Sequence, residues 1–193
     1  MKPVWLMQPI RYFREKLEEV WIWDKKLDGW KMQIIKKENG EIEFWRRRLE
    51  KIFNWKEKLR YLIPFIEKII PCGTILDSKL CVCKGGRFIL SLFAALSKNK
   101  PLVYVFDVIY LNKEFIGISP LEKRKKTFKE FKLRPPFYFL IFQKLKNIER
   151  IFEKAWKEVL RISRSYDKGV LLSQRYFFEA VYVEKWRKLA EES

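Results

Sequence analysis

The residue with the clearest chemical potential is Lys26, in the sequence Asp24-Lys25-Lys26-Leu27-Asp28-Gly29-Trp30-Lys31. A deprotonated lysine amine is a nucleophile, and a turn that fixes its position makes it more effective. Asp28-Gly29 is typical of a tight turn, and the apolar residues on both sides predict a hairpin between Trp21 and Ile34. The motif alone also fits an incidental lysine in a surface turn.

Histidine is absent from the chain, which excludes histidine-based acid/base catalysis, histidine-containing triads and histidine metal sites. The three cysteines, Cys72, Cys81 and Cys83, include only a lone Cys-x-Cys, which lacks the paired spacing of a zinc site. We therefore expect reduced cysteines, no metal site and a cytoplasmic location.

The chain is strongly basic, with 42 Lys and Arg against 24 Asp and Glu and a formal charge of +18. This excess predicts a polyanionic partner, either nucleic acid or nucleotide. Solvated lysines in a heat-adapted protein would account for part of the excess. No signal peptide or membrane-length apolar run is present, so no membrane association is expected.

At 193 residues with 48% hydrophobic composition, the chain predicts a single domain over 1–193, with residues 1–20 as a lead-in that includes a short helix. Periodicity and turn signals predict strands at 42–48, 73–82, 101–110, 170–173 and 182–189, and helices at 55–70, 88–96, 121–131 and 144–162. Asn39-Gly40 predicts a two-residue turn before the first of these strands. The charge run in the helix at 121–131 is typical of a solvated face.

With these segments in order, most of the chain, from about Trp21 to Ala190, resembles the adenylation domain of ATP-dependent DNA ligases. Asp24 to Lys31 resembles the family's nucleophile motif, in which lysine is followed by any residue and then Asp-Gly. The other matching segments are Phe44-Trp45-Arg46-Arg47, Ile75-Leu76-Asp77-Ser78-Lys79, Phe106-Asp107 in its strand, Pro120-Leu121-Glu122-Lys123-Arg124, Lys168-Gly169-Val170-Leu171-Leu172 and Trp186-Arg187-Lys188-Leu189.

The resemblance implies an α+β fold of two mainly antiparallel sheets, with flanking helices, that form a nucleotide cleft. It implies that Lys26 takes AMP from ATP and that Phe106 stacks on adenine while Lys188 contacts the α-phosphate. Nucleotide-binding roles are implied for Asp24, Asp28, Gly29, Lys31, Arg46, Phe106 and Lys188. The implied cofactor is ATP, and the implied substrate is DNA with a nick in the duplex.

Several family positions are altered. Lys79 and Lys168 replace carboxylates, and Mg²⁺ sites are built from carboxylate oxygens, so the expected Mg²⁺ ligands are missing. Lys31 replaces the motif's arginine, and Ser173 and Ala190 replace lysines. The chain stops at Ser193, so no C-terminal oligonucleotide-binding-fold domain is expected, and a separate protein would have to supply that domain or DNA-end binding.

Three functions stay open from the sequence. In the first, Lys79 and Lys168 replace metal charge and lower the pKa of Lys26, which keeps some ligase-type activity. In the second, the site is catalytically degenerate and the fold acts as a nucleotide- or DNA-binding module with a partner. In the third, the chain is a structural or interaction protein with no nucleotide chemistry.

Overall fold

The computed structural model describes residues 1–6, 8–11, 21–25, 27, 29–46, 48–49, 51, 53–81, 100–144, 160–164, 171–174 and 181–185. The chain forms two compact units. Unit 1 comprises Met1–Trp5, Leu27–Gly117 and Arg124–Phe139, and unit 2 comprises Leu6–Lys26, Ile118–Lys123 and Leu140–Ser193. Each unit is built on one six-stranded sheet.

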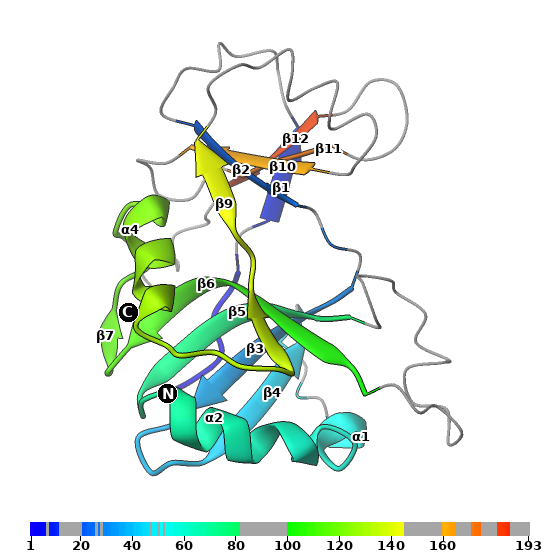
Figure 1. Cartoon of the computed structure of the whole chain (residues 1–193), viewed down its shortest axis with the longest axis vertical. Helices are drawn as coiled ribbons and strands as arrows, with labels where there is room; N and C mark the ends of the chain where they lie inside the picture. Colours follow the sequence, from blue (N-terminus) through cyan, green and yellow to red (C-terminus); the bar gives the residue numbers. More distant parts are fainter. Residues whose placement is uncertain are drawn as a thin grey trace. The chain divides into compact units, whose positions relative to one another are not determined.

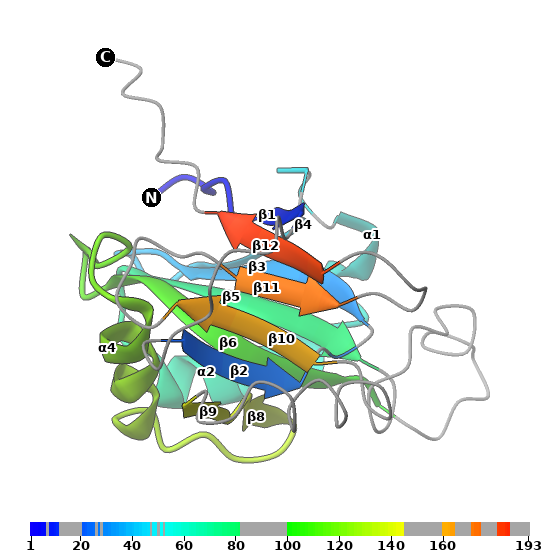
Figure 2. The ribbon, with the colours of Figure 1, turned by 90° about the horizontal axis from the view of Figure 1, so that it is seen from above.

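Sheet A lies in unit 2 and has the strand order β1-β12-β11-β10-β2-β9. All of its neighbouring strands pair antiparallel, and Figure 2 shows them side by side. Its strands are β1 (Gln8–Arg11), β2 (Trp21–Lys25), β9 (Phe142–Lys144), β10 (Leu160–Arg164), β11 (Leu171–Gln174) and β12 (Val181–Lys185).

Sheet B lies in unit 1 and has the order β4-β3-β5-β6-β7, with β8 paired to β6. Its pairs are antiparallel except for β6 and β8, which run parallel. Its strands are β3 (Trp30–Lys36), β4 (Ile42–Arg46), β5 (Thr74–Cys81), β6 (Leu102–Leu111), β7 (Glu114–Phe115) and β8 (Phe137–Phe139).

The helices are short: α1 (Phe53–Lys56), the 3-10 turn η1 (Arg60–Leu62), α2 (Ile63–Ile69), α4 (Leu121–Lys126) and η2 (Thr127–Lys129). Figure 1 shows α1 and α2 along one face of sheet B. The core packs on this face and includes Met32 and Ile34 of β3 together with Leu62 and Ile66. Alternate residues of β3, including Lys31, point to the opposite face because side chains alternate along a strand.

The α+β class is confirmed, and two mainly antiparallel sheets with flanking helices are present. A hairpin at Asn39-Gly40 is confirmed, because β3 and β4 pair antiparallel, but the two-residue turn is wrong, since residues 37–41 separate Lys36 from its partner Ile42. The strands predicted at 73–82 and 101–110 correspond to β5 and β6. In the predicted helix 55–70, the break falls before Pro64, which lies in the first turn of α2 and is compatible with a helix start.

The predicted hairpin between Trp21 and Ile34 is wrong. Strand β2 pairs with β9 and β10 in sheet A, whereas β3 pairs with β4 and β5 in sheet B. Both edges of each strand are therefore occupied by other strands. The segment between them passes from one sheet to the other, which an alternating apolar pattern cannot reveal, because the pattern identifies a strand but not its neighbours.

The predicted helix at 144–162 is wrong at its ends, since Lys144 closes β9 and Leu160–Arg164 forms β10. Residues 160–164 alternate apolar and polar, a period-two signal that the longer helical pattern obscured. The helices predicted at 12–20 and 88–96 and the rest of this one lie outside the described residues. β11 and β12 bear out the last strand pair as far as residue 185.

The N-terminal residues are part of the fold. Gln33 Nε2 donates to the Val4 carbonyl at 2.7 Å, and the Val4 amide donates to Gln33 Oε1 at 3.0 Å. Val4 and Leu6 are buried, and Gln8–Arg11 pairs with β12. The first residues thus contribute contacts to both units.

A cation cluster around Glu43 fixes the β3–β4 hairpin. Lys51 Nζ and Lys37 Nζ lie 2.6 and 3.1 Å from Glu43 Oε1, and Trp45 Nε1 donates to Oε2 at 2.8 Å. Burial alone would raise the pKa of Glu43, but hydrogen bonds from Lys51, Trp45 and Lys37 outweigh it and lower the pKa to about 2.

This cluster predicts an acid-dependent stability. The pKa of Glu43 is about 2 when folded, against 4.5 as its ordinary value, so its contribution is full above pH 4.5 and is lost as the pH falls toward 2. We expect Glu43→Gln to cost about 1–2 kcal/mol at pH 7 and to flatten the loss of stability between pH 5 and 2. Urea unfolding at a series of pH values measures the free energy of unfolding, and Glu41→Gln, at an exposed position, is the control. Equal pH profiles for wild type and Glu43→Gln would contradict the prediction.

Within the described residues, no helix combines the length and apolarity that crossing a membrane requires. Cys72 is exposed and Cys81 is buried, and both are free thiols; Cys83 lies outside the described residues.

Candidate active site

The segment around the candidate nucleophile is anchored on strand β5. Lys26 and Asp28 lie outside the described residues, but their neighbours Leu27 and Gly29 are placed. Leu27 is buried. A Cβ added to Gly29 would lie 2.7 Å from the Leu80 carbonyl oxygen and 2.5 Å from Cys81 Sγ, so only glycine fits this close approach to the backbone.

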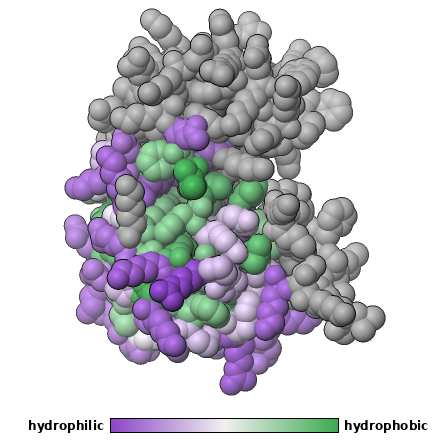
Figure 3. Space-filling view, in the orientation of Figure 1, coloured by the Kyte–Doolittle hydropathy of each residue, from purple (hydrophilic) through white to green (hydrophobic). Residues whose placement is uncertain are grey.

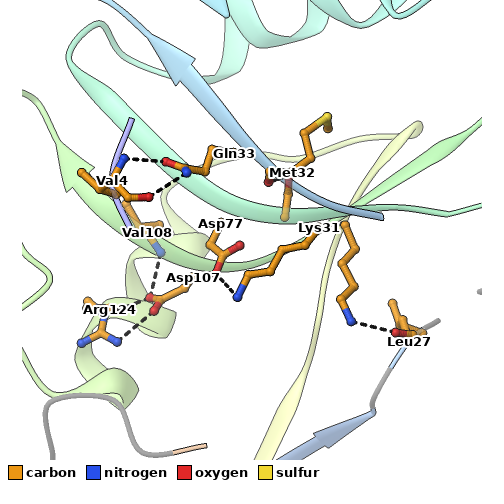
Figure 4. Close-up of polar contacts among 11 residues, drawn as sticks. Val4, Leu27, Lys31, Met32, Gln33, Asp77, Asp107, Val108 and Arg124 are labelled. Carbon is orange, nitrogen blue, oxygen red and sulfur yellow. Dashed lines mark hydrogen bonds and ion pairs between the residues drawn. The ribbon is translucent and has the colours of Figure 1, made fainter. Parts of the chain in front are cut away.

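Lys79 lies beside this segment rather than in a metal site. Its Nζ donates to the carbonyl oxygen of Leu27 at 3.0 Å, the contact that ends on Leu27 in Figure 4. Lys79 also stands directly opposite Lys31 in the β3–β5 register. The charge reversal that the sequence indicated therefore brings two lysines onto adjacent strands.

Lys31 connects a carboxylate and an aromatic ring. Its Nζ lies 3.3 Å from Asp77 Oδ2, as Figure 4 shows, and 5.6 Å from the centre of the Phe106 ring. The Lys31 side chain is 12% exposed and that of Asp77 is 1% exposed. Screening by water is weak there, so the ion pair and the cation–π contact hold the lysine strongly.

A β-bulge places Phe106 in this cluster. Asp77 faces Asp107, but the adjacent Ser78 faces Val105, which leaves Phe106 as an extra residue on β6. A bulge of this kind redirects a side chain. The side chain of Phe106 therefore does not follow the regular alternation of side chains along β6. It lies under the Lys31 ammonium, on the strand next to Asp77.

The structure gives a structural role to Asp107 and Arg124, to which the sequence analysis assigned none. Arg124 Nε and Nη2 donate to the two oxygens of Asp107 at 2.9 and 2.8 Å, and Nη1 donates to the Gly117 carbonyl at 3.0 Å. Both side chains are buried, as is Lys125. The expectation that the charge run at 121–131 is a solvated face is thus wrong for Arg124 and Lys125. The signal that could have found the pair was its position in two matching family segments.

Arg46 is not brought together with Lys31. It stands opposite Met32 and therefore on the face of sheet B that carries the core. Its guanidinium lies 4.9 Å from the ring centre of Trp30 and 4.8 Å from that of Trp55. Its nucleotide-binding role stays a prediction.

The remaining expected positions are only partly placed. Asp24 is a buried residue of β2 in unit 2. Ser173 lies in β11, opposite Arg161 and Tyr182. Lys168, Lys188 and Ala190 lie outside the described residues. The structure thus unites Lys31 and Lys79 with Phe106 in unit 1.

The donor set around Asp77 does not fit Mg²⁺. The ammonium of Lys31 already lies beside this carboxylate, and the family carboxylate two residues on is Lys79. A divalent cation requires several oxygen ligands. Among the residues that the structure describes, no cluster of three or more Cys, Asp or Glu side chains is arranged to hold a metal ion.

Figure 3 views the surface from one side, with apolar residues across the middle of the described part and hydrophilic residues around them.

Two mainly antiparallel sheets, one of which carries a lysine, carboxylate and aromatic cluster beside Leu27 and Gly29, define an α+β domain. The family model described as ATP dependent DNA ligase domain matches residues 6–164. The chain belongs to this family.

One curated protein is similar in sequence, and two solved structures are similar in fold. The SPbeta prophage-derived DNA ligase-like protein LigB of Bacillus subtilis (strain 168) is 28% identical over 130 residues, which are 64% of this chain and 46% of that protein. The ligase domain of M. tuberculosis LigD matches with a TM-score of 0.59 at 15% identity, over 85% of this chain and 52% of that one. A Lig E DNA ligase, described as binding DNA with a minimal scaffold, matches with a TM-score of 0.56 at 14% identity, over 93% and 68% of the two chains. The chain spans about half the length of LigB and of the LigD domain.

Proposed function

We propose that this domain forms a covalent lysyl-AMP at Lys26 from ATP, as the first step of a DNA ligase-type reaction. The observation that carries the proposal is the docking of Leu27 and Gly29 on β5, next to the Lys31, Asp77 and Phe106 cluster, within a chain of the ligase family. In this proposal residues 1–193 act as one adenylation domain. The proposed location is the cytoplasm.

The chemistry is a displacement at phosphorus. The neutral Nζ of Lys26 attacks the α-phosphorus of ATP, the bond from that phosphorus to the bridging oxygen breaks, pyrophosphate leaves, and the amine gives up a proton to solvent. Positive charge near the α-phosphate stabilises the developing negative charge. Among the described residues we assign this positive charge to Lys31, and Lys188 is a further candidate.

ATP would be held by this chain's own side chains. Phe106 offers a ring for adenine, whose stacking would replace the contact that the Lys31 ammonium now makes with that ring. Released from the ring, Lys31 keeps its ion pair with Asp77 and can face phosphate. Among the described residues, the Asp77 carboxylate is paired with the Lys31 ammonium, and no cluster of three or more acidic or cysteine side chains is arranged to hold a metal ion.

The test is retention of label from α-³²P-ATP on a denaturing gel, with and without Mg²⁺ or Mn²⁺. We expect wild type and the exposed Lys68→Ala to retain label and Lys26→Ala to lose it completely, because the phosphoramide forms on that amine. Equal labelling of Lys26→Ala, or no label on wild type, would refute the proposal.

The second candidate is a nucleotide- or DNA-binding module without chemistry, acting with a partner protein. The observation that favours it is Lys79, which stands where the family has a carboxylate and donates to a backbone carbonyl. Its mark is an unlabelled wild-type protein whose affinity for nicked duplex falls steeply with salt, because each neutralised phosphate releases counterions.

A further inference from the structure

The last three residues of β5 contact the segment that follows Lys26. Lys79 Nζ binds the Leu27 carbonyl at 3.0 Å. Gly29 lies so close to Leu80 and Cys81 that a Cβ could not be added, and Trp30 then pairs with Leu80 as β3 begins. Three consecutive residues of one strand thus fix the chain immediately after the candidate nucleophile.

From these contacts we propose that Lys79 is a positioning residue for Lys26. The inference rests on the proposed function, in that it gives Lys79 a part in lysine adenylation. Leu27 follows Lys26 directly, and the bond to its carbonyl restricts the peptide unit that begins at Leu27, one residue after the nucleophile. Because the Leu27 side chain is itself buried, this residue is held by its side chain and by its backbone.

The bond requires a hydrogen-bond donor at this position, which Lys79 supplies. A backbone carbonyl accepts hydrogen bonds, an ammonium group only donates, and an ionised carboxylate only accepts. The family's glutamate could not make this contact. In the family, the carboxylate at this position helps to bind metal or nucleotide. Lysine at position 79 instead joins β5 to the segment at Leu27 by a hydrogen bond.

The neighbouring lysine is compatible with this role. Lys31 stands opposite Lys79, and two unpaired ammonium groups there would repel each other. Each is directed to its own acceptor, Lys31 to Asp77 and Lys79 to Leu27. The two ammonium groups can therefore occupy adjacent strands, because each has a different acceptor.

Positioning affects rate strongly, because a displaced nucleophile misses the in-line geometry of attack. A misplacement of about 1 Å costs about a hundredfold in rate. The decisive comparison uses full-length Lys79→Met, which keeps the stem but cannot donate, Lys79→Arg, which can donate, and Lys79→Glu, which restores the family residue. Lys68→Met on the exposed face of α2 is the matched control.

The first measurement is hydrogen exchange at residues 27–30, which needs no catalysis and so separates this inference from the proposed function. We expect exchange there to rise at least about tenfold in Lys79→Met and Lys79→Glu, with β6 unchanged, and to stay near wild type in Lys79→Arg and Lys68→Met. Unchanged exchange in Lys79→Met would overturn the proposal even if wild type labels Lys26.

The second measurement is the initial rate of Lys26 labelling across pH. Loss of positioning lowers the high-pH plateau by about ten- to a hundredfold in Lys79→Met and more in Lys79→Glu. A loss that vanishes at high or low pH would show that residue 79 acts through the pKa of Lys26, and it would overturn the positioning role. Faster labelling by Lys79→Glu would also overturn it, since it would mean that the family carboxylate is simply missing.

Discussion

Replacing Arg124 by methionine is expected to lower the free energy of unfolding by about 3–5 kcal/mol, the usual cost of removing one partner from a buried ion pair. The Arg124 side chain is 0% exposed and that of Asp107 is 1% exposed. Methionine leaves the Asp107 carboxylate without its two guanidinium bonds, and it leaves the Gly117 carbonyl without Nη1. Urea denaturation monitored by tryptophan fluorescence measures the loss.

The control for this prediction is Arg60→Met. Arg60 pairs with Glu57 at 3.8 Å with both side chains 79% exposed, so its loss should cost less than about 0.5 kcal/mol. A double variant, Asp107→Leu with Arg124→Met, should recover at least about 1 kcal/mol relative to Arg124→Met, since no buried charge is then left alone. A cost under 1 kcal/mol for Arg124→Met would mean that the pair does not stabilise unit 1.

The strands were the most predictable part of the fold. β5 and β6 were visible because β-branched and aromatic residues cluster there, and the β3–β4 turn was visible because Asn39-Gly40 tolerates positive φ, with Gly40 at +84°. What a local pattern does not contain is the identity of a strand's neighbours. Strands β2 and β3 are close in sequence but join different sheets, because β2 pairs with β9 and β10 far along the chain whereas β3 pairs with β4 and β5.

In the candidate site too, some features were predictable from the sequence and others were not. Lys31, Lys79 and Phe106 were identified by their places in family segments, and the structure brings them together on sheet B. Their partners were not predictable, since Lys79 binds the backbone of Leu27 and the bulge at Phe106 depends on the β5–β6 register. The buried charge of Arg124 was missed because a solvated run and a buried pair have the same composition.

The sequence identified Gly29 as important, but the structural reason differs from the predicted one. The Asp-Gly pair predicted a tight turn, but the described requirement is the close approach of Gly29 to β5. Alanine there would collide with the Leu80 carbonyl oxygen, a backbone atom that cannot rotate away. We expect Gly29→Ala to shift the segment after Lys26 and to slow adenylation of Lys26 by about a hundredfold, with a loss of about 1–3 kcal/mol in stability.

Label retention from α-³²P-ATP measures the rate, and thermal unfolding measures the stability. The control is Gly40→Asn, at a position with φ of +84° and nothing within 4 Å of an added Cβ; asparagine tolerates that conformation, so its rate should match wild type. Adding Cys81→Ala to Gly29→Ala should restore only part of the loss, because it removes the Sγ contact but leaves the Leu80 carbonyl in place. Wild-type labelling by Gly29→Ala, or full rescue by Cys81→Ala, would show that the backbone of β5 does not set the position of the nucleophile segment.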